Sequence, residues 1–511
     1  MDRKWFSLVA IVTGVFMLLI DVTIVNVALP DIAVDLRASF TSVEWVVNAY
    51  SLMLASSLLV AGGVADMVGR RKVFVAGLIL FSAASLACGL AQTPLFLNLM
   101  RGVQGVGGGL MFATSLAIIA QSFHGRDRGI AFGILVAVTG AAVAIGPLAG
   151  GILTEAFSWE AIFFVNIPIG AFAIFMTLRF VEESKDPHPA GIDWLGAVLF
   201  ASALFLFIFG LVDGNKEGWG SPQILGCLFG GLAILIVFVL VELRRENPLF
   251  DLSLLKKPAF VGASMVAFCM SASLFALFLF LTLYMQGGVL GYGPLGAGLR
   301  FLPITGMMLL VGPIAGRLTT IVQVRFLLGG GLALVGIGIL LMHGVELGNT
   351  WMVLLVGFFV AGIGSGMVNP PLASTAIGVV EPRRSGMASG INSTFRQVGI
   401  ASGVAGLGAI FQHQVGAKMN EGLAGTPAAA HADQLTGAVT SGQTERALNA
   451  IPGNVSPAQI DQIREVAQGA FVSGLNELFL VTAGIALIGA VGALILVRQK
   501  DFVAPPESTV D

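Results

Sequence analysis

The chain has 511 residues, of which 56% are hydrophobic and only 11% are charged, and its mean hydropathy is +0.91. Soluble domains carry roughly 25% Asp, Glu, Lys and Arg, so this composition excludes an ordinary soluble enzyme and predicts a membrane protein. The net charge of −2 does not indicate a partner, because in a membrane protein the positions of the charges carry the information.

Fourteen runs along the chain are long enough to cross a bilayer, which takes about 20 mostly apolar residues. They lie at 6–29, 43–65, 73–91, 94–121, 130–153, 159–180, 193–212, 222–242, 258–285, 294–315, 326–344, 350–373, 386–412 and 471–497. These runs predict an all-α polytopic membrane protein with both termini on the same side.

The basic residues fix the expected orientation, since Lys and Arg concentrate in cytoplasmic loops. If the N-terminus is cytoplasmic, 19 of the 27 Lys and Arg fall on the cytoplasmic side and only five in the opposite loops. The 19 are Arg3, Lys4, Arg70, Arg71, Lys72, Arg126, Arg128, Arg179, Lys185, Arg244, Arg245, Lys256, Lys257, Arg317, Arg325, Arg383, Arg384, Arg498 and Lys500. Both termini are therefore expected in the cytoplasm. Segment 413–470 is expected outside, as a flexible hairpin or lid that ends in a helix opened by Ser456 and Pro457.

An internal repeat divides the chain. Residues 104–111 (QGVGGGLM) align with 361–368 (AGIGSGMV). The shared glycines are Gly105 and Gly362, Gly107 and Gly364, and Gly109 and Gly366. The seventh and eighth runs belong to neither copy. We therefore expect six-helix bundles at 1–185 and 251–511, with two inserted transmembrane helices at 186–250.

A short charged loop, GGVADMVGRRK, joins the second and third runs. One acid and a basic cluster in a turn bounded by glycines can form charge pairs with helix ends, and such pairs hold two bundles together in one state and release them in another. The candidate latch residues are Gly62, Asp66, Gly69, Arg70 and Arg71. The alternative is that the basic residues only set the topology.

Two charged residues lie deep inside predicted helices, where an unpaired charge costs several kcal/mol. Asp21 and Arg101 both fall on the order of 10–14 Å below the outer face, from the 1.5 Å rise per residue, so they can pair or share a cavity. An acid that alternates between paired and unpaired surroundings can couple transport to protons. The alternative is a permanent brace that never titrates. Arg300, near the outer edge, and Glu477, expected to start the last helix, receive no role.

The charged loop at 62–72 resembles the signature loop of the major facilitator superfamily, although Met67 stands where that family usually has a basic residue. Other segments resemble the fourteen-helix drug:proton antiporter branch of that family. They are LLIDVTIVNVALP (18–30), EWVVNAYSL (44–52), RGVQGVGG (101–108), TGAAVAIGPLAGG (139–151), SWEAIFFVNIPIG (158–170) and ASGINSTFRQVGIASG (388–403). Glu160 departs from the branch, which usually has arginine there.

The resemblance implies a major facilitator fold and a proton-coupled antiporter that exports amphipathic drugs or toxic organic compounds by alternating access. It implies a monomer in the bacterial inner membrane, no cofactor apart from protons as the coupling ion, and no nucleic acid partner. The antiporter helix residues are Gly146, Pro147, Gly150 and Gly151, where small residues allow tight packing and the Gly-Pro step bends the helix. By analogy the substrate cavity residues are Tyr50, Met53, Phe275, Tyr284, Asn369, Asn392 and Arg396.

Other functions have less support. The sequence has no GxxxxGK[ST] phosphate loop and no histidines at metal-ligand spacing. Export of an endogenous metabolite, lipid precursor or siderophore remains an alternative, and the excess of buried arginine over buried carboxylate favours neutral or anionic cargo. A receptor or assembly scaffold that does not transport is a further alternative, against which the intact Asp21, Arg101 and antiporter segment argue.

Overall fold

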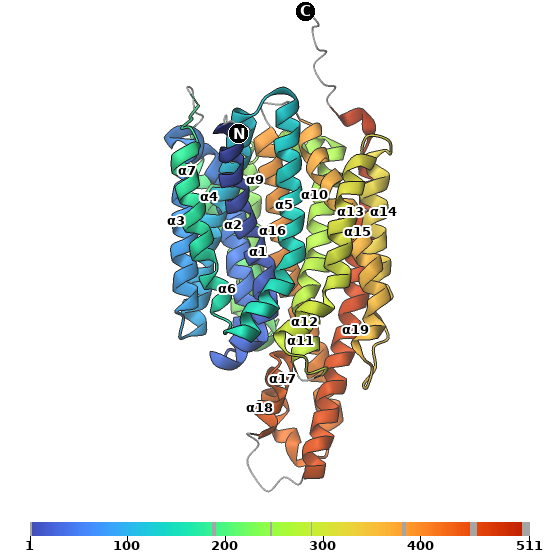
Figure 1. Ribbon diagram of the computed structural model, residues 1–511. Helices are drawn as coiled ribbons and strands as arrows, with labels where there is room; N and C mark the ends of the chain where they lie inside the picture. The colour runs from blue at the N-terminus through green and yellow to red at the C-terminus, as the bar shows by residue number, and fades with distance from the viewer. Residues whose placement is uncertain are drawn as a thin grey trace, which may run out of the picture.

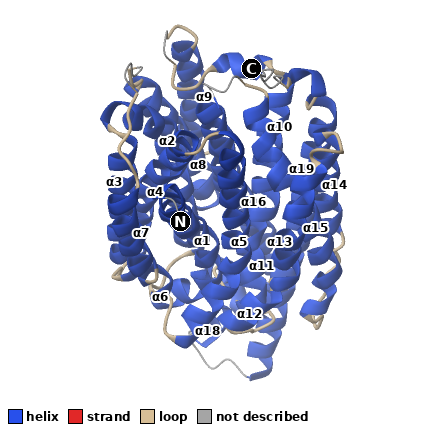
Figure 2. Cartoon of the chain, turned by 45° about the horizontal axis from the view of Figure 1, so that its top comes forward, coloured by secondary structure: helices blue, strands red, loops and turns tan. Residues whose placement is uncertain are grey.

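The computed structural model describes residues 3–186, 191–245, 248–287, 289–380, 385–449 and 457–502, and every regular element in these ranges is helical (Figures 1 and 2). Arg383, Arg384 and Ser456, used in the sequence analysis, lie outside the described residues. The elements of the first half are α1 Arg3–Asp35, α2 Phe40–Val68, α3 Arg70–Gly89, α4 Pro94–Ser122, α5 Gly125–Ala156, α6 Ala161–Phe164 and α7 Asn166–Phe180.

Two helices, α8 Trp194–Glu217 and α9 Pro222–Glu242, follow the first half and pack on each other. The elements after them are η1 Leu252–Lys256, α10 Pro258–Met270, η2 Ser271–Phe275, α11 Ala276–Gln286, α12 Pro294–Arg300, α13 Leu302–Leu318, α14 Val324–Leu340, η3 Trp351–Leu354, α15 Leu355–Gly378, α16 Ser385–Leu423, η5 Pro427–His431, α17 Ala432–Thr440, α18 Thr444–Asn449, α19 Pro457–Leu496 and η6 Gln499–Asp501.

The predicted fold class is confirmed. Eleven helical stretches in the described part are long and apolar enough to cross a membrane, and the pair α12–α13, bent by 42°, makes a twelfth. The remaining two predicted runs correspond to α14, with 17 residues, and α16, with 39 residues. Each of the fourteen runs is therefore a helix or a broken helix.

The repeated glycines allow close helix packing in both halves. A Cβ at Gly105 would collide with the backbone of α2, one at Gly109 with the Ser57 side chain of the same helix, and one at Gly107 with the backbone of α3. In the second half, Gly362 and Gly366 contact the backbone of α13 and Gly364 that of α14. Small residues allow helices to approach closely where no hydrophobic effect drives them together. Thus α4 lies between α2 and α3 as α15 lies between α13 and α14.

The two ends of the molecule differ. Helix α1 begins and helix α19 ends at one end of the molecule, called here the terminal end, and α17 and α18 lie at the opposite end, the loop end (Figure 1). The first and second halves meet mainly through α2 with α16 and through α5 with α12 and α13. Helix α8 contacts both α2 and α16, so the inserted pair covers one side of this junction.

The segment expected as a flexible hairpin is largely helical. Helix α16 continues to Leu423, beyond the run that predicted its end, and η5, α17 and α18 follow it. Helix α19 begins at Pro457, as the proline predicted, so the expectation that Glu477 starts the last helix is wrong. Glu477 lies well inside α19 and is exposed. Arg300 ends α12, with its guanidinium carbon 3.4 Å from the centre of the Tyr292 ring.

Candidate functional site

Asp21 of α1 and Arg101 of α4 form a buried ion pair in the first half. Arg101 Nη1 lies 2.5 Å from Asp21 Oδ2, and the two side chains are 2% and 0% exposed. Arg101 also donates from Nε to the Val46 carbonyl at 3.1 Å and from Nη1 to Gln104 Oε1 at 2.8 Å. The depths calculated from the sequence therefore placed the two residues correctly as partners.

Two amides complete the partners of the aspartate. Gln104 Nε2 and Asn166 Nδ2 donate to Asp21 Oδ1 at 2.9 and 3.0 Å, and Asn166 Nδ2 also lies 3.0 Å from Ser85 Oγ. The sequence analysis missed both amides. Gln104 could have been found because it lies three residues after Arg101 on the same helix face, and Asn166 because it is a polar residue inside an apolar run.

Aromatic rings close the cluster from the side. The Arg101 guanidinium carbon lies 4.2 Å from the Tyr50 ring centre and 5.8 Å from that of Phe163. The Tyr50 hydroxyl donates to the Leu18 carbonyl at 3.3 Å. Both members of a buried ion pair stay ionised when their hydrogen bonds are satisfied. Removal of one partner leaves the charge of the other uncompensated. Asp21 and Arg101 therefore depend on each other for charge compensation.

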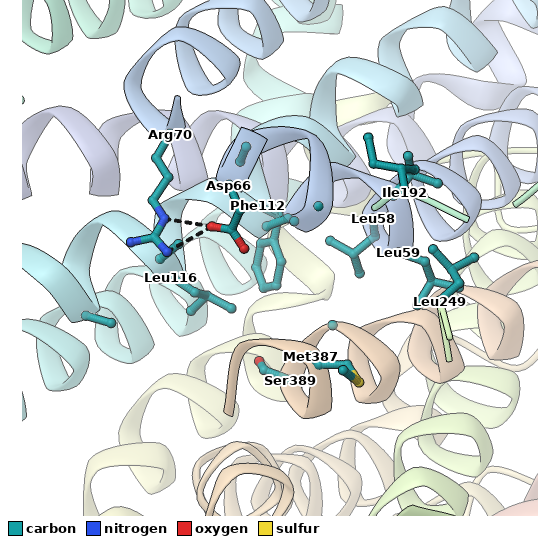
Figure 3. Close-up of a pocket in the computed structure, with 18 of the residues that line it drawn as sticks. Leu58, Leu59, Asp66, Arg70, Phe112, Leu116, Ile192, Leu249, Met387 and Ser389 are labelled. Atoms are coloured by element: carbon teal, nitrogen blue, oxygen red, sulfur yellow. Dashed lines mark hydrogen bonds and ion pairs between the residues drawn. The ribbon is translucent and has the colours of Figure 1, made fainter. Parts of the chain in front are cut away.

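A cavity of about 500 Å³ opens near the terminal end. Helices α2, α4 and α5 form one wall, and the start of α16 and the segments at 191–193 and 248–249 form the other. Figure 3 shows Phe112 and Leu116 between the charged Asp66–Arg70 pair and α16, which contributes Met387 and Ser389. The cavity is mainly apolar with a charged edge, a composition suited to amphipathic molecules.

The charged edge is the predicted latch segment. Asp66 Oδ1 accepts from Arg70 Nε at 3.0 Å and Nη2 at 2.8 Å, and Arg70 Nη1 donates to Gln121 at 2.8 Å. Gly69 separates α2 from α3 with φ +124°, a conformation that favours glycine. These hydrogen bonds all lie within the first half. The predicted pairing between bundles therefore stays a prediction about another conformation.

The rest of the latch segment is held by an acid that follows α7. Glu183 Oε1 accepts from the backbone N–H of Arg71 at 3.1 Å, and Arg71 Nη1 donates to the Val181 carbonyl at 3.2 Å. Gly62 lines the cavity and has no neighbouring atom within 4 Å of where a Cβ would stand. The segment is thus built into the first half and borders the cavity.

The predicted antiporter helix α5 seals the loop end. A Cβ at Gly150 would lie 2.6 Å from the Ile24 carbonyl oxygen of α1, and one at Gly146 would overlap the Thr23 side chain. A Cβ at Gly151 would lie 2.6 Å from the Pro294 carbonyl oxygen of α12. The carbonyl of Pro147 is as close to the Cβ position of Gly298 in α12. The small residues therefore bring α5 against both halves.

Three hydrogen bonds join the halves at the same end. Gln286 Nε2 donates to the Val27 carbonyl at 2.9 Å. The Leu295 N–H donates to Glu155 at 2.9 Å, and Gln443 Nε2 donates to the Ala38 carbonyl at 2.8 Å. With the glycine contacts of α5, these bonds close the loop end, while the cavity lies toward the terminal end.

The residues expected to line a substrate cavity divide into separate groups. Arg396 Nη2 donates to Asn369 Oδ1 at 2.9 Å and its guanidinium carbon lies 5.3 Å from the centre of the Phe275 ring, so these three meet in the second half. Asn392, one turn earlier in α16, has an unpartnered Nδ2. None of the seven lines the cavity of about 500 Å³.

The other three belong to packed regions. Tyr50 belongs to the Asp21–Arg101 cluster. Tyr284 is buried, with its ring centre 6.4 Å from that of Phe471. Met53 is half-buried and lies near Gly102 and Gly105 of α4. Their role in binding cargo stays a prediction. Within the described ranges, no group of three His, Cys, Asp or Glu could hold a metal ion.

Comparisons with known proteins agree with this architecture. The sequence profile of the Major Facilitator Superfamily matches residues 11–404. The chain is 32% identical over 492 residues to Multidrug resistance protein Stp of Mycobacterium tuberculosis (strain CDC 1551 / Oshkosh), covering 95% of this chain and 91% of that protein. It is 31% identical over 523 residues to the Tetracenomycin C resistance and export protein of Streptomyces glaucescens, covering 99% and 94%.

Solved structures with a similar fold include the following example. It is a bacterial homolog of the human lysosomal transporter Spinster in an inward-facing and occupied conformation. The TM-score is 0.69 at 15% sequence identity, with 99% of each chain covered. At this identity the likeness concerns the fold alone.

Proposed function

The chain belongs to the Major Facilitator Superfamily and is a transporter rather than an enzyme, and on this premise we propose that it exports amphipathic drugs or toxic organic compounds in exchange for protons. The observation that carries the proposal is the buried Asp21–Arg101 pair, in which an acidic side chain inside a predicted membrane span is paired with a single cationic side chain. The names of the two relatives, which state multidrug resistance and tetracenomycin C export, support drug-like cargo.

Transport follows from two conformations of the same halves. In the conformation described, the loop end is closed by α5 and α12 and the cavity lies toward the terminal end. Opening of the loop end and closure of the terminal end would present the cavity to the other side. The halves in this proposal are residues 1–185 and 251–511, and residues 186–250 are the inserted pair.

We place the terminal end in the cytoplasm, because the predicted orientation puts 19 of 27 basic residues there. The transporter is then inward-facing in a bacterial inner membrane and loads its cargo from the cytoplasm. Reporter fusions at Asp511 and inside the α17–α18 region test this placement. A reporter at Asp511 that is active only outside the cytoplasm would overturn it.

The proton step follows from charge balance at Asp21. An ionised Asp21 holds Arg101, whereas a protonated Asp21 carries no charge to compensate it. A proton arriving at Asp21 therefore releases Arg101, and its departure restores the pair. Proton gain and loss at one carboxyl thereby favour different arrangements of α1 and α4, which lets a proton gradient drive export.

The test compares Asp21→Asn with Asp35→Asn. Both residues lie on α1, but Asp35 is exposed at the loop end and accepts from Trp159 Nε1 at 2.9 Å, a bond that asparagine can keep. Each variant is expressed in an efflux-deficient bacterial host and assayed with a panel of dyes and antibiotics. Proton-driven accumulation of the compounds that respond is then measured in inverted vesicles.

We expect Asp21→Asn to abolish uphill accumulation while downhill exchange of the same compound persists, because the cavity is unchanged. Asp35→Asn should transport as the unmodified chain does. Full proton-driven accumulation by Asp21→Asn would refute the coupling role, and no response of the host to any compound would refute drug export.

One observation favours a second candidate, the export of an endogenous anionic metabolite or siderophore. Arg396 is half-buried in the second half, and its partner in the described part is the neutral amide of Asn369 rather than a carboxylate. A cation held in this way can receive an anionic group of the cargo. Arg396→Gln should weaken transport of anionic compounds selectively, and equal loss for neutral and cationic compounds would refute this candidate.

A further inference from the structure

Glu44 is a buried carboxyl group that the proton step above does not use. It lies in the second turn of α2, near the loop end, and has no exposed surface. Among the described residues, neither of its two carboxyl oxygens has a protein hydrogen-bond partner. An ionised carboxylate here would have lost its water without gaining a donor, which is prohibitively unfavourable, and such a group neutralises instead. A neutral carboxyl is therefore the form that suits this position.

The surroundings of Glu44 belong to three helices that come from different parts of the chain. Helices α2, α8 and α16 contact one another, and all three are seen together in Figure 2. The carboxyl of Glu44 lies directly over Gly408 of α16, where a Cβ would overlap Oε1. The ring of Phe40 also faces Gly408. A seam between the two halves, defined here by Glu44 and Gly408, thus closes over the carboxyl.

The charged neighbours of Glu44 do not offer it a counter-ion. Asp213 of α8 acts on it electrostatically and is itself buried. Lys216 and Glu217 follow on α8 and act on Asp213. The histidine of α16 near the seam, His413, is exposed. The negative charge of an ionised Asp213 adds repulsion to the cost of ionising Glu44 while the seam is closed.

A polar stripe continues from Glu44 along α2. Asn48 and Ser51 follow at the spacing of one helix face. Both are buried, and their side-chain polar atoms have no protein partner in the part of the chain that the structure describes. Farther along, Thr394 Oγ1 of α16 lies 3.5 Å from the Ala55 carbonyl, so α16 stays beside the stripe. Buried polar groups without partners are the groups that take up water when space opens. Separation of α2 from α16 would therefore hydrate Glu44.

We propose that Glu44 is a second proton-binding site, filled from the loop end, and that its protonation allows α2 and α16 to close over it. The inference rests on the alternating access of the proposed function. When the seam opens, water reaches the carboxyl, and an exposed glutamic acid ionises with a pKa of about 4.3. When it closes, the carboxylate takes one proton from that water and enters the seam as a neutral carboxyl.

The direction of the pH effect follows from this proton count. The closed state binds one more proton than the open state, so a lower pH favours closure, by up to about tenfold in the closed-to-open ratio per pH unit. With the loop end outside the cell, an acidic exterior would favour the conformation that loads cargo from the cytoplasm. This is the direction that drug export against proton entry requires.

The test measures the opening of the loop end directly, without any cargo. Spin labels are placed at Gln92 and Glu346, which are exposed in the α3–α4 and α14–η3 connections of the two halves, after substitution to cysteine. Cys227, the half-buried native cysteine, is replaced by serine. Distance distributions between the labels are then recorded in lipid nanodiscs from pH 5.5 to 8.5.

We expect the short-distance, closed population to fall as the pH rises. Glu44→Gln, which mimics the protonated form, should hold the loop end closed at every pH. Glu477→Gln, which removes an exposed carboxyl of α19, is the matched control and should keep the pH response. Asp21→Asn is measured beside it to show whether the other candidate proton site causes the response.

Loss of the response in Asp21→Asn but not in Glu44→Gln would overturn the proposal, as would a distance distribution that does not change with pH in the unmodified chain. Since the distances are measured without cargo, failure of drug export leaves this test intact. Conversely, proton-driven export by a protein whose loop end ignores pH would refute only the role of Glu44.

Discussion

A close approach of backbone to backbone between the halves gives a prediction whose size can be worked from the structure. A Cβ added at Gly151 of α5 would lie 2.6 Å from the Pro294 carbonyl oxygen and 2.8 Å from Leu295 Cα, both in the backbone of α12. An ordinary contact needs at least 3.4 Å, so α5 and α12 must separate by about 3.4 − 2.6 = 0.8 Å. Backbone cannot rotate away as a side chain can, and overpacking of this kind costs about 1–3 kcal/mol.

Opening of the loop end in the proposed transport cycle would part α5 from α12, so Gly151→Ala should penalise the closed state and leave the open state unaffected. A penalty of 1–3 kcal/mol corresponds to about a 5- to 150-fold fall in the closed-to-open ratio. The labels at positions 92 and 346 measure this ratio as the growth of the long-distance population.

Gly140→Ala is the matched control, because it lies on the same helix with no atom within 4 Å of its Cβ position. Both substitutions raise helix propensity equally, so only the contact with α12 distinguishes them. An unchanged distance distribution in Gly151→Ala, or the same shift in Gly140→Ala, would show that the α5–α12 contact does not control the loop end.

Three further predictions concern the charged groups. Asp21→Asn alone should lower the free energy of unfolding by about 3–5 kcal/mol, since it leaves Arg101 buried and uncompensated. Combined with Arg101→Gln, it should regain most of that stability but no coupled transport. Regained transport in the double variant would identify the pair as a structural brace. Asp66→Asn should reduce transport while expression and ligand binding persist, and loss of folded protein would favour a purely topogenic or structural segment. The hydrogen bond and charge of Arg464 hold the pKa of Glu445 below its usual value. This pair should therefore stabilise the loop-end hairpin above the unfolded pKa of about 4.3, and the stabilisation should be lost as the pH falls through the lower folded pKa. Hydrogen exchange of α18 at pH 7 and pH 3 should show this loss, and Glu445→Gln should abolish the difference.

Hydropathy predicted the helices along the chain, and depth in the membrane related Asp21 to Arg101 in the first half. The fourteen runs follow from the length of apolar helix that a bilayer demands, and each corresponds to a helix. Position along the membrane normal predicted that Asp21 and Arg101 could pair or share a cavity, and the structure shows them paired. Such a depth says nothing about rotation around a helix axis, so it could not reveal that Gln104 and Asn166 also reach the carboxylate.

Two features depend on tertiary packing that no run discloses. Glu44 stands at the edge of an apolar run, where a glutamate is normally solvated, and it is buried only because α8 and α16 cover it. The sequence predicted a hairpin in segment 413–470 and a helix from Pro457, but it did not predict the helices in the rest of the segment. A helix outside the membrane no longer needs apolar residues on every face. Hydropathy therefore does not indicate the parts of α16 and α19 that continue beyond the bilayer.

The long helices that form this hairpin also have a mechanical consequence. Helices α16 and α19 have 39 and 40 residues, which at 1.5 Å per residue is about 60 Å, twice the hydrocarbon thickness of about 30 Å. Both run from the bundle into the hairpin (Figure 1), so the hairpin is a lever attached to the second half. Any tilt of that half moves the tip farther than any point inside the bilayer. An antibody fragment that holds the tip in place would therefore restrict the tilt of the second half, and so inhibit the transporter from outside the membrane.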